Sequence, residues 1–151
     1  MTQPFPAPRP QAVLFACGFN SVRSPMAAAL LQALHPAVYV RSAGVRKAPL
    51  DGFAVAAMAE AGLDIAGHVP VTLQELDDWE GLNFDLIVTL SPEAHHRALD
   101  LTRTEAAEVE YWPTPDPTAA DGTREQRLAA YREVRDYLDR RIRDRFGMPA
   151  P

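Results

Sequence analysis

Short apolar runs alternate along the chain with longer segments in which apolar residues recur every three or four positions. The runs suit strands that are buried on both faces, and the spacing in the longer segments is typical of helices packed on one side. The expected strands are 12–16, 38–40 (with a turn at 42–44), 84–90 and 108–111, and the expected helices are 25–34, 51–61, 92–101 and 123–146. This alternation predicts an α/β fold, a single-domain, doubly wound, four-stranded parallel sheet with helices on both faces.

Residues at the helix ends support these boundaries. Ser24 is expected to cap the helix that begins at Pro25, because serine is a favoured N-cap and proline a favoured first helical residue. Thr123 and Gln126 have the spacing of a capping box at the start of the last helix. The apolar stripe that should pack this helix on the core is Leu128, Tyr131, Val134, Leu138, Ile142 and Phe146.

Proline is concentrated at the N-terminus, where four of the first ten residues are proline. Proline lacks a backbone donor and disfavours helix in the residue before it. We therefore expect residues 1–10 to form a flexible, proline-rich tail, residues 11–147 to form the domain, and residues 148–151 to form a short C-terminal tail.

The composition narrows the possible partners and the compartment. The 151 residues are 47% hydrophobic and 23% charged, which is typical of a folded domain, and their net charge is −5. An acidic chain is a poor partner for nucleic acid or an anionic membrane, and no apolar run approaches the length of a membrane helix. A single cysteine cannot form an internal disulfide, and the N-terminus does not resemble a signal peptide, so we expect a cytoplasmic protein.

The loop after the first strand carries the strongest chemical signal. Residues 17–25 read Cys-Gly-Phe-Asn-Ser-Val-Arg-Ser-Pro, with a cysteine at the end of the strand and an arginine just before a helix. The N–H groups of a helix N-terminus and an arginine fork form an anion site, and both favour the thiolate form of Cys17. A nucleophile inside an oxyanion cradle suits covalent phosphoryl transfer. A lone cysteine is otherwise most often a buried, unreactive side chain.

The wider context of this loop resembles one family. Residues 13–27 resemble the phosphate-binding loop of the low-molecular-weight protein tyrosine phosphatases. Ser42-Ala-Gly44 resembles the second element of that family, and Asp116-Pro117 resembles its general-acid loop. The order and spacing of the three motifs also fit, and the resemblance extends over residues 12–146.

The resemblance implies a role for each matching residue. Cys17 attacks phosphorus to form a phosphocysteine, and Asp116 protonates the leaving oxygen and then activates the hydrolytic water. Arg23 and the loop amides hold the phosphate oxygens. The phosphate-binding residues implied in this way are Gly18, Phe19, Asn20, Ser21, Val22, Arg23 and Ser24.

The resemblance also implies supporting roles for four residues around the catalytic residues. The family pairs the asparagine that matches Asn20 with the serine that matches Ser42. Ser24 is expected to donate a hydrogen bond to the sulfur of Cys17, besides capping the helix. Pro117 stiffens the loop around the general acid.

The chain also departs from the family pattern. Phe19 stands where the family usually has glycine, and the glycine has moved to Gly18. Many members have a second cysteine where this chain has Val22. The aromatic residues that wall the site in the eukaryotic enzymes are replaced by residues 45–48, Val-Arg-Lys-Ala, and by Thr118. Phosphatase chemistry is therefore better supported than a preference for phosphotyrosine, and Phe19 is a candidate substrate contact at the mouth.

The leading hypothesis is a phosphatase that hydrolyses a phosphorylated protein or a small phosphomonoester, with aryl phosphates as the first candidates. Phosphate, vanadate and arsenate are expected to compete for the same cradle. One alternative is an arsenate reductase, which with a single cysteine would need an external thiol. The other is a phosphate-binding module without catalysis, which would need neither Cys17 nor Asp116.

No metal or cofactor is expected from the histidines. His95 and His96 are adjacent on a predicted helix, so their side chains point in different directions and make a poor metal pair. We interpret them as exposed or capping residues. His35 and His68 have no evident partners in the sequence.

Overall fold

A computed structural model describes residues 9–103 and 106–149. Most of the predicted N-terminal tail and the last two residues of the predicted C-terminal tail lie outside these ranges. The strands are β1 Ala12–Cys17, β2 Tyr39–Gly44, β3 Leu86–Thr89 and β4 Glu108–Tyr111. The helices are α1 Arg23–Leu34, α2 Gly52–Glu60, α3 Leu73–Glu80, α4 Pro92–Leu101, the short 3₁₀ helix η1 Pro117–Ala119, and α5 Arg124–Phe146.

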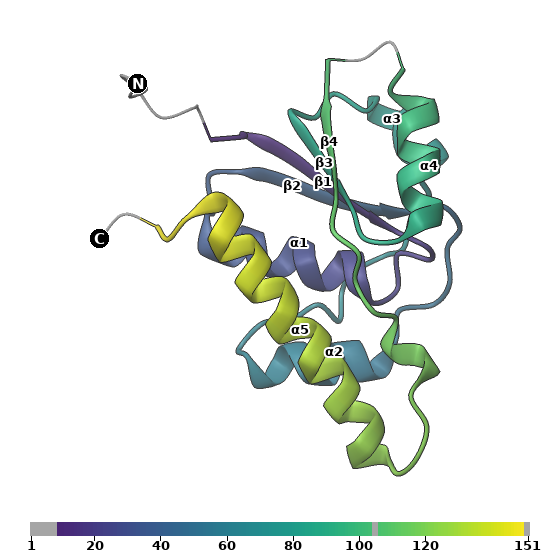
Figure 1. Cartoon of the computed structure of the whole chain (residues 1–151), viewed down its shortest axis with the longest axis vertical. Coiled ribbons are helices and arrows are strands. Elements are labelled where there is room, and N and C mark those ends of the chain that lie inside the picture. Colours follow the sequence, from purple (N-terminus) through teal and green to yellow (C-terminus); the bar gives the residue numbers. More distant parts are fainter. Residues whose placement is uncertain (1–8, 104–105, 150–151) are drawn as a thin grey trace.

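The four strands form one parallel sheet in the order β2-β1-β3-β4 (Figure 1). This arrangement confirms the predicted doubly wound α/β fold. The chain reverses its direction of winding at β1, which is paired on both sides. The carboxyl end of β1 is therefore the position where such sheets bind ligands.

The central strand β1 divides the core into two halves. Val13, Phe15 and Cys17 belong to the larger apolar cluster, which includes residues of α1, α2 and α5. Leu14 and Ala16 belong to the smaller cluster on the other face, which includes residues of α3 and α4. Successive side chains of a strand point to opposite faces, so a fully apolar strand is buried on both sides. Cys17, the last residue of β1, is thereby only 2% exposed.

Helix α3 was not expected from the sequence. It begins with a capping box, in which the Thr72 hydroxyl accepts from the Glu75 N–H and the Glu75 carboxylate accepts from the Thr72 N–H. Its own residues Leu73 and Leu76 are buried. The Thr-x-x-Glu spacing was the available signal, but the helix is short and its two buried leucines make a weak periodic pattern.

The second strand is longer than predicted. Residues 42–44, expected as a turn, continue β2 and pair with the last residues of β1, where Cys17 is opposite Gly44. Small residues are poor strand formers by propensity, and pairing with β1 decides their conformation. The third strand is shorter than expected and spans Leu86–Thr89.

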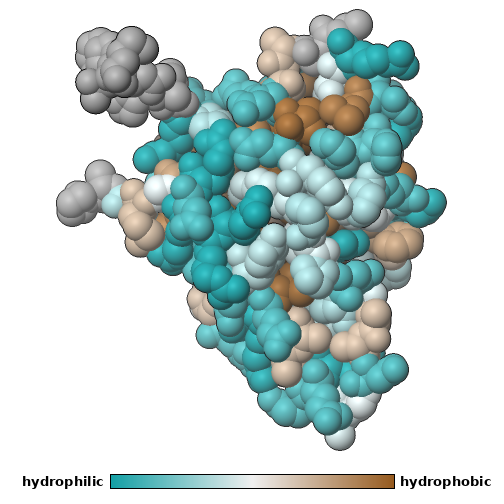
Figure 2. Space-filling view, viewed as in Figure 1, coloured by the Kyte–Doolittle hydropathy of each residue, from teal (hydrophilic) through white to brown (hydrophobic). Residues whose placement is uncertain are grey.

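The last helix packs as predicted. All six residues of its apolar stripe are buried. Its outer side is covered by hydrophilic residues, which Figure 2 shows along the front of the molecule. Across the two described ranges, no helix is long and apolar enough to cross a membrane.

Candidate active site

The candidate site occupies the junction between β1 and α1. Helix α1 begins at Arg23, and Val22 precedes it as an N-cap without a side-chain hydrogen bond. The prediction that Ser24 caps this helix is therefore wrong, because Ser24 lies inside the first turn. Its Oγ instead lies 2.9 Å from the Sγ of Cys17, in a buried contact.

The carbonyl groups of the loop are turned outward. Those of residues 17–19 and Ser21 accept hydrogen bonds of 2.9–3.2 Å from backbone N–H groups within residues 45–51, which follow β2. The backbone N–H groups of residues 19–22 donate to no other residue that the structure describes. A loop held in this way keeps its donors available, and together with the N-terminus of α1 it forms a cradle suited to an anion.

Asn20 holds the loop together from inside. Its Nδ2 donates to the Oγ atoms of Ser24 and Ser42, each at 2.9 Å. Its Oδ1 accepts from the backbone N–H of Val71 at 2.9 Å, and since that group can only donate, the orientation of the amide is settled. Asn20 is fully buried and has a φ of 55°, a left-handed conformation that asparagine adopts more readily than most residues.

The Ser24 hydroxyl has a defined role in this network. Its oxygen accepts from Asn20, so its own proton is free to be donated. The nearest acceptors are the Sγ of Cys17 at 2.9 Å and the carbonyl oxygen of Ala43 at 3.4 Å. A thiolate sulfur can only accept, so the Ser24 hydroxyl is placed to donate to the sulfur whenever Cys17 is deprotonated.

His68 is a contact that the sequence did not reveal. No partner was evident in the sequence, but its Nε2 lies 3.1 Å from both the backbone oxygen and the Oδ1 of Asn20. Both atoms are acceptors, so Nε2 carries a proton and donates. Burial lowers the pKa of His68, and the nearby Arg41 lowers it further, which favours the neutral ring. His68 lies 48 positions from Asn20 in the sequence, and no local sequence pattern predicts a contact over that separation.

The other histidines lie outside this network. His35 also has partners, the carbonyl oxygen of Gly147 at 2.7 Å and the guanidinium of Arg9 at 3.2 Å. His95 is neither fully exposed nor a cap; its Nδ1 lies 2.9 Å from the Thr89 Oγ1. Among residues 9–103 and 106–149, no three His, Cys, Asp or Glu side chains are grouped so as to hold a metal ion.

Gly44 leaves room for the loop. It lies opposite Cys17 in the sheet, and a Cβ at this position would be 2.7 Å from the backbone nitrogen of Asn20 and 2.8 Å from the carbonyl carbon of Phe19. The same Cβ would also meet the backbone oxygen of Arg46 at 2.3 Å. All three atoms belong to the backbone and cannot turn aside, so only glycine fits here.

Arg23 connects the loop to the segment that carries Asp116. Its Nη1 donates to the carbonyl oxygen of Thr114 at 3.1 Å. Two residues further on, Asp116 precedes η1, where Pro117 is the first residue. The Asp116 Oδ1 accepts from the N–H and the Oγ1 of Thr118, at 3.0 and 2.7 Å. The structure thus brings Arg23 to the segment that bears Asp116 and leaves this carboxylate exposed.

Tyr131 ties α5 to the same region. Its hydroxyl donates to the Oδ2 of Asp51 at 2.6 Å, while the Oδ1 of Asp51 caps α2 and its backbone N–H donates to the carbonyl of Ser21. Burial and the Asp51 carboxylate raise the pKa of Tyr131, and the charge of Asp116 contributes in the same direction. The sequence pattern placed Tyr131 in the apolar stripe of the last helix, but it did not predict the hydrogen bond to Asp51.

The comparisons with known proteins agree with this geometry. Residues 12–146 match the family of the low molecular weight phosphotyrosine protein phosphatases. The chain is 35% identical over 133 residues to an arsenate reductase of Bacillus subtilis, covering 87% of this chain and 92% of that protein. It is 30% identical over 141 residues to a probable low molecular weight protein-tyrosine-phosphatase of Ralstonia nicotianae, covering 87% and 91%.

A solved structure supports the same assignment. An arsenate reductase in the phosphate binding state superposes with a TM-score of 0.68 at 25% identity, over 89% of this chain and 95% of that one. The chain therefore belongs to the low molecular weight phosphotyrosine protein phosphatase family.

Proposed function

We propose that the protein is a cysteine-dependent phosphatase that hydrolyses aryl phosphomonoesters through a phosphocysteine. The observation that carries the proposal is the loop around Cys17, whose carbonyls are bonded outward while the Ser24 Oγ lies 2.9 Å from the sulfur. A thiolate at the base of an anion cradle is placed to attack phosphorus. In phosphoryl transfer, such positioning and electrostatic stabilisation supply most of the catalysis.

The reaction has two steps in this proposal. The sulfur of Cys17 attacks phosphorus, the bond from phosphorus to the ester oxygen breaks, and Asp116 donates its proton to that oxygen. Water then attacks the phosphocysteine, gives a proton to Asp116, and releases phosphate with the thiolate restored. Arg23 and the loop amides hold the three remaining oxygens throughout.

Hydrolysis of a simple aryl phosphate tests this function. Wild-type protein and Cys17→Ala are compared with EDTA present, since the mechanism uses no metal. Turnover by the wild type alone supports the phosphatase. Turnover that persists in Cys17→Ala would contradict it, and tight phosphate binding without turnover would support the silent binding module instead.

Arsenate reduction is the second candidate, because several relatives of this chain are named arsenate reductases. Reduction of arsenate to arsenite takes two electrons. Cys17 is the only cysteine in the chain, so it can form an arsenic–sulfur adduct but cannot close an internal disulfide. An external thiol would attack the Cys17 sulfur, form a mixed disulfide and release arsenite.

The thiol requirement separates the two candidates. Arsenite that forms with glutathione and not without it would favour the reductase. Absence of arsenite with every thiol tested would eliminate it. Phosphatase turnover needs no thiol as co-substrate, so the two assays report different chemistry at the same loop.

A further inference from the structure

Phe19 is an exposed aromatic ring within the anion-binding loop itself. Its side chain is 44% exposed, although it lies only two residues after the nucleophile candidate. Consecutive Cα atoms are about 3.8 Å apart, so the Cα atoms of Phe19 and Cys17 are at most about 7.6 Å apart. The carbonyl oxygen of Phe19 accepts from the N–H of Ala48 at 3.2 Å, so its backbone is fixed. A ring that is exposed this close to the sulfur is accessible to a molecule bound in the loop.

The guanidinium of Arg46 lies over this ring, and both the side chain and the backbone of Arg46 are hydrogen-bonded. Its guanidinium carbon lies 5.9 Å from the centre of the Phe19 ring. The guanidinium makes two hydrogen bonds to the carboxylate of Glu93, of 3.0 and 2.9 Å, and the backbone N–H donates to the carbonyl oxygen of Gly18 at 2.9 Å. A bidentate pair of this kind fixes orientation as well as charge. Arg46 therefore restricts where the Phe19 ring can lie.

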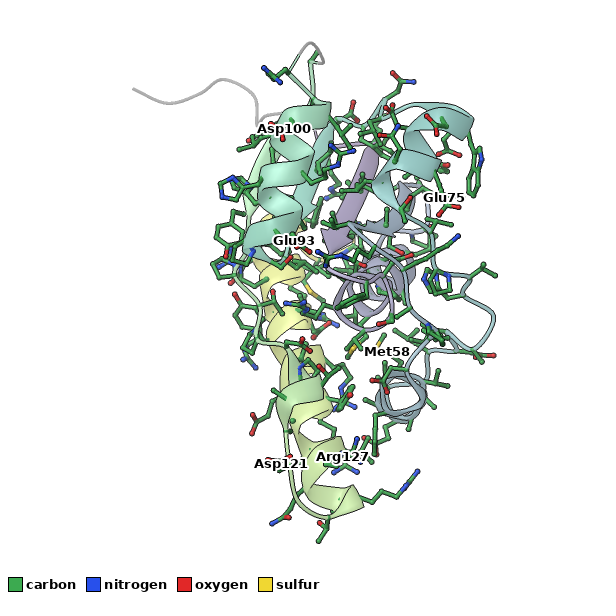
Figure 3. All side chains as sticks on the ribbon, turned by 90° about the vertical axis from the view of Figure 1, so that its right-hand side faces the viewer. Met58, Glu75, Glu93, Asp100, Asp121 and Arg127 are labelled. Carbon is green, nitrogen blue, oxygen red and sulfur yellow. The ribbon has the colours of Figure 1, made fainter. Side chains whose placement is uncertain are left out.

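The ion pair joins the segment after β2 to the helices on the same side of the sheet. Figure 3 shows Glu93 at the lower end of α4 and Glu75 on α3. Glu75 binds Lys47, the neighbour of Arg46, at 2.9 Å. The two adjacent cations are thus held by different helices, and only Arg46 contacts the ring of Phe19.

We propose that Phe19 is a specificity-determining residue that forms the aryl-binding wall of the site, with Arg46 and Glu93 as its positioning residues. The inference rests on the proposed phosphatase function and deepens it. A cation over one face of a ring leaves the other face and the edge available to a second ring. The regions that correspond to the aromatic walls of the eukaryotic enzymes, residues 45–48 and Thr118, hold no aromatic side chain here. Phe19 is the aromatic group that the loop offers in their place.

Direct binding of two phosphonates tests the wall without requiring turnover. Methylphosphonate reports the anion cradle alone, and phenylphosphonate adds an aromatic ring. The measured quantity is the ratio of their dissociation constants, determined by calorimetry, because changes in charge affect both ligands equally and cancel. An aromatic pair supports a change of about three- to tenfold, so Phe19→Ala should reduce the preference for phenylphosphonate over methylphosphonate by this factor.

Two further variants test the positioning role. Arg46→Ala should reduce the phenyl-over-methyl ratio by about twofold, since the ring is present but no longer held. Lys47→Ala is the matched control, because it breaks the neighbouring ion pair and does not touch the ring; it should leave the ratio unchanged. An equal effect of the two variants would overturn the role of Arg46.

The outcomes for the wall and for the function are distinct. An unchanged ratio in Phe19→Ala, with both phosphonates still bound, would overturn the wall and leave the phosphatase proposal standing. A loss of both ligands to the same extent in Phe19→Ala would mean that the residue only supports the loop, and would also overturn the wall. Failure of the wild type to bind methylphosphonate would contradict the anion cradle. It would also overturn the role of Phe19 as the aryl-binding wall, because that role depends on the cradle.

Discussion

The Oγ of Ser24 lies 2.9 Å from the Sγ of Cys17, and the same oxygen accepts a hydrogen bond from the Nδ2 of Asn20. These two contacts place the serine hydroxyl to donate to a deprotonated sulfur, which can only accept. They also explain why a serine stands inside the first turn of α1, where it does not cap the helix. The relationship depends on Asn20, whose amide is oriented by the backbone N–H of Val71.

Replacing Ser24 tests whether its hydroxyl supports the thiolate. Ser24→Ala should slow alkylation of Cys17 by iodoacetamide by about tenfold near neutral pH, because a hydrogen bond to a charged group contributes about 1.5–3 kcal/mol. Ser42→Ala is the matched control, since it removes the other acceptor of the Asn20 amide without a contact to the sulfur. Equal alkylation rates in the two variants would contradict a specific role for Ser24.

Gly44 provides a test of the loop geometry. Gly44→Ala places a Cβ within 3 Å of three backbone atoms, so it should lower the free energy of unfolding by about 1–3 kcal/mol and weaken phosphate binding. Gly67→Ala is the control, because a Cβ there meets nothing within 4 Å. Urea unfolding and calorimetric titration with phosphate measure both effects. Normal phosphate affinity in Gly44→Ala would show that the loop adapts to the extra methyl group.

His68 predicts a specific dependence of stability on pH. The pKa of the folded residue is lowered from 6.5, mainly by burial. The unfolded state therefore takes up a proton on this residue at a higher pH than the folded state does, and stability falls as the pH drops below about 6.5. This loss is complete once the pH is below the folded pKa.

The measurement is urea unfolding of the wild type and His68→Gln at about pH 7.5 and pH 5.5. We expect a smaller loss of unfolding free energy on acidification in the variant, because glutamine does not titrate. An equal loss in both proteins would assign the pH dependence to other groups and contradict the lowered pKa of His68.

The role of Asp116 as general acid predicts a dependence on the leaving group. Asp116→Asn should slow hydrolysis of an alkyl phosphate by about a hundredfold or more, since general acid catalysis contributes about 10²–10⁴. The same variant should slow p-nitrophenyl phosphate far less, because its leaving oxygen needs little protonation. Steady-state rates with both substrates give the comparison, and equal slowing would remove Asp116 from the protonation step.

The fold was largely predictable because its signals are local and agree with one another. The short, continuous apolar run of β1 is typical of a strand buried on both faces, and the stripe on α5 has the spacing of a helix. Helix α3 was missed because it is short, and residues 42–44 were misread because pairing with β1 overrides their weak strand propensity.

The site was predictable only in part. Cys17 and Arg23 lie close together in the sequence, so their spacing is enough to predict a nucleophile within an anion-binding loop. The bond from His68 to Asn20 and the bond from Tyr131 to Asp51 join residues 48 and 80 positions apart. Such contacts arise from the packing of the whole domain, and a sequence pattern read along one segment does not contain them. Ser24 illustrates both cases, since its contact with the Cys17 sulfur was predicted from the loop but its predicted role as a helix cap was wrong.

Trapping of the intermediate tests the central claim most directly. The wild type is mixed with an aryl phosphate and quenched in acid within its first turnover, and its peptides are analysed by mass spectrometry. The account predicts one phosphoryl group on Cys17, and a longer-lived adduct in Asp116→Asn, because the hydrolytic water is no longer activated. Turnover with no phosphoryl group on Cys17, or with one on another side chain, would contradict it.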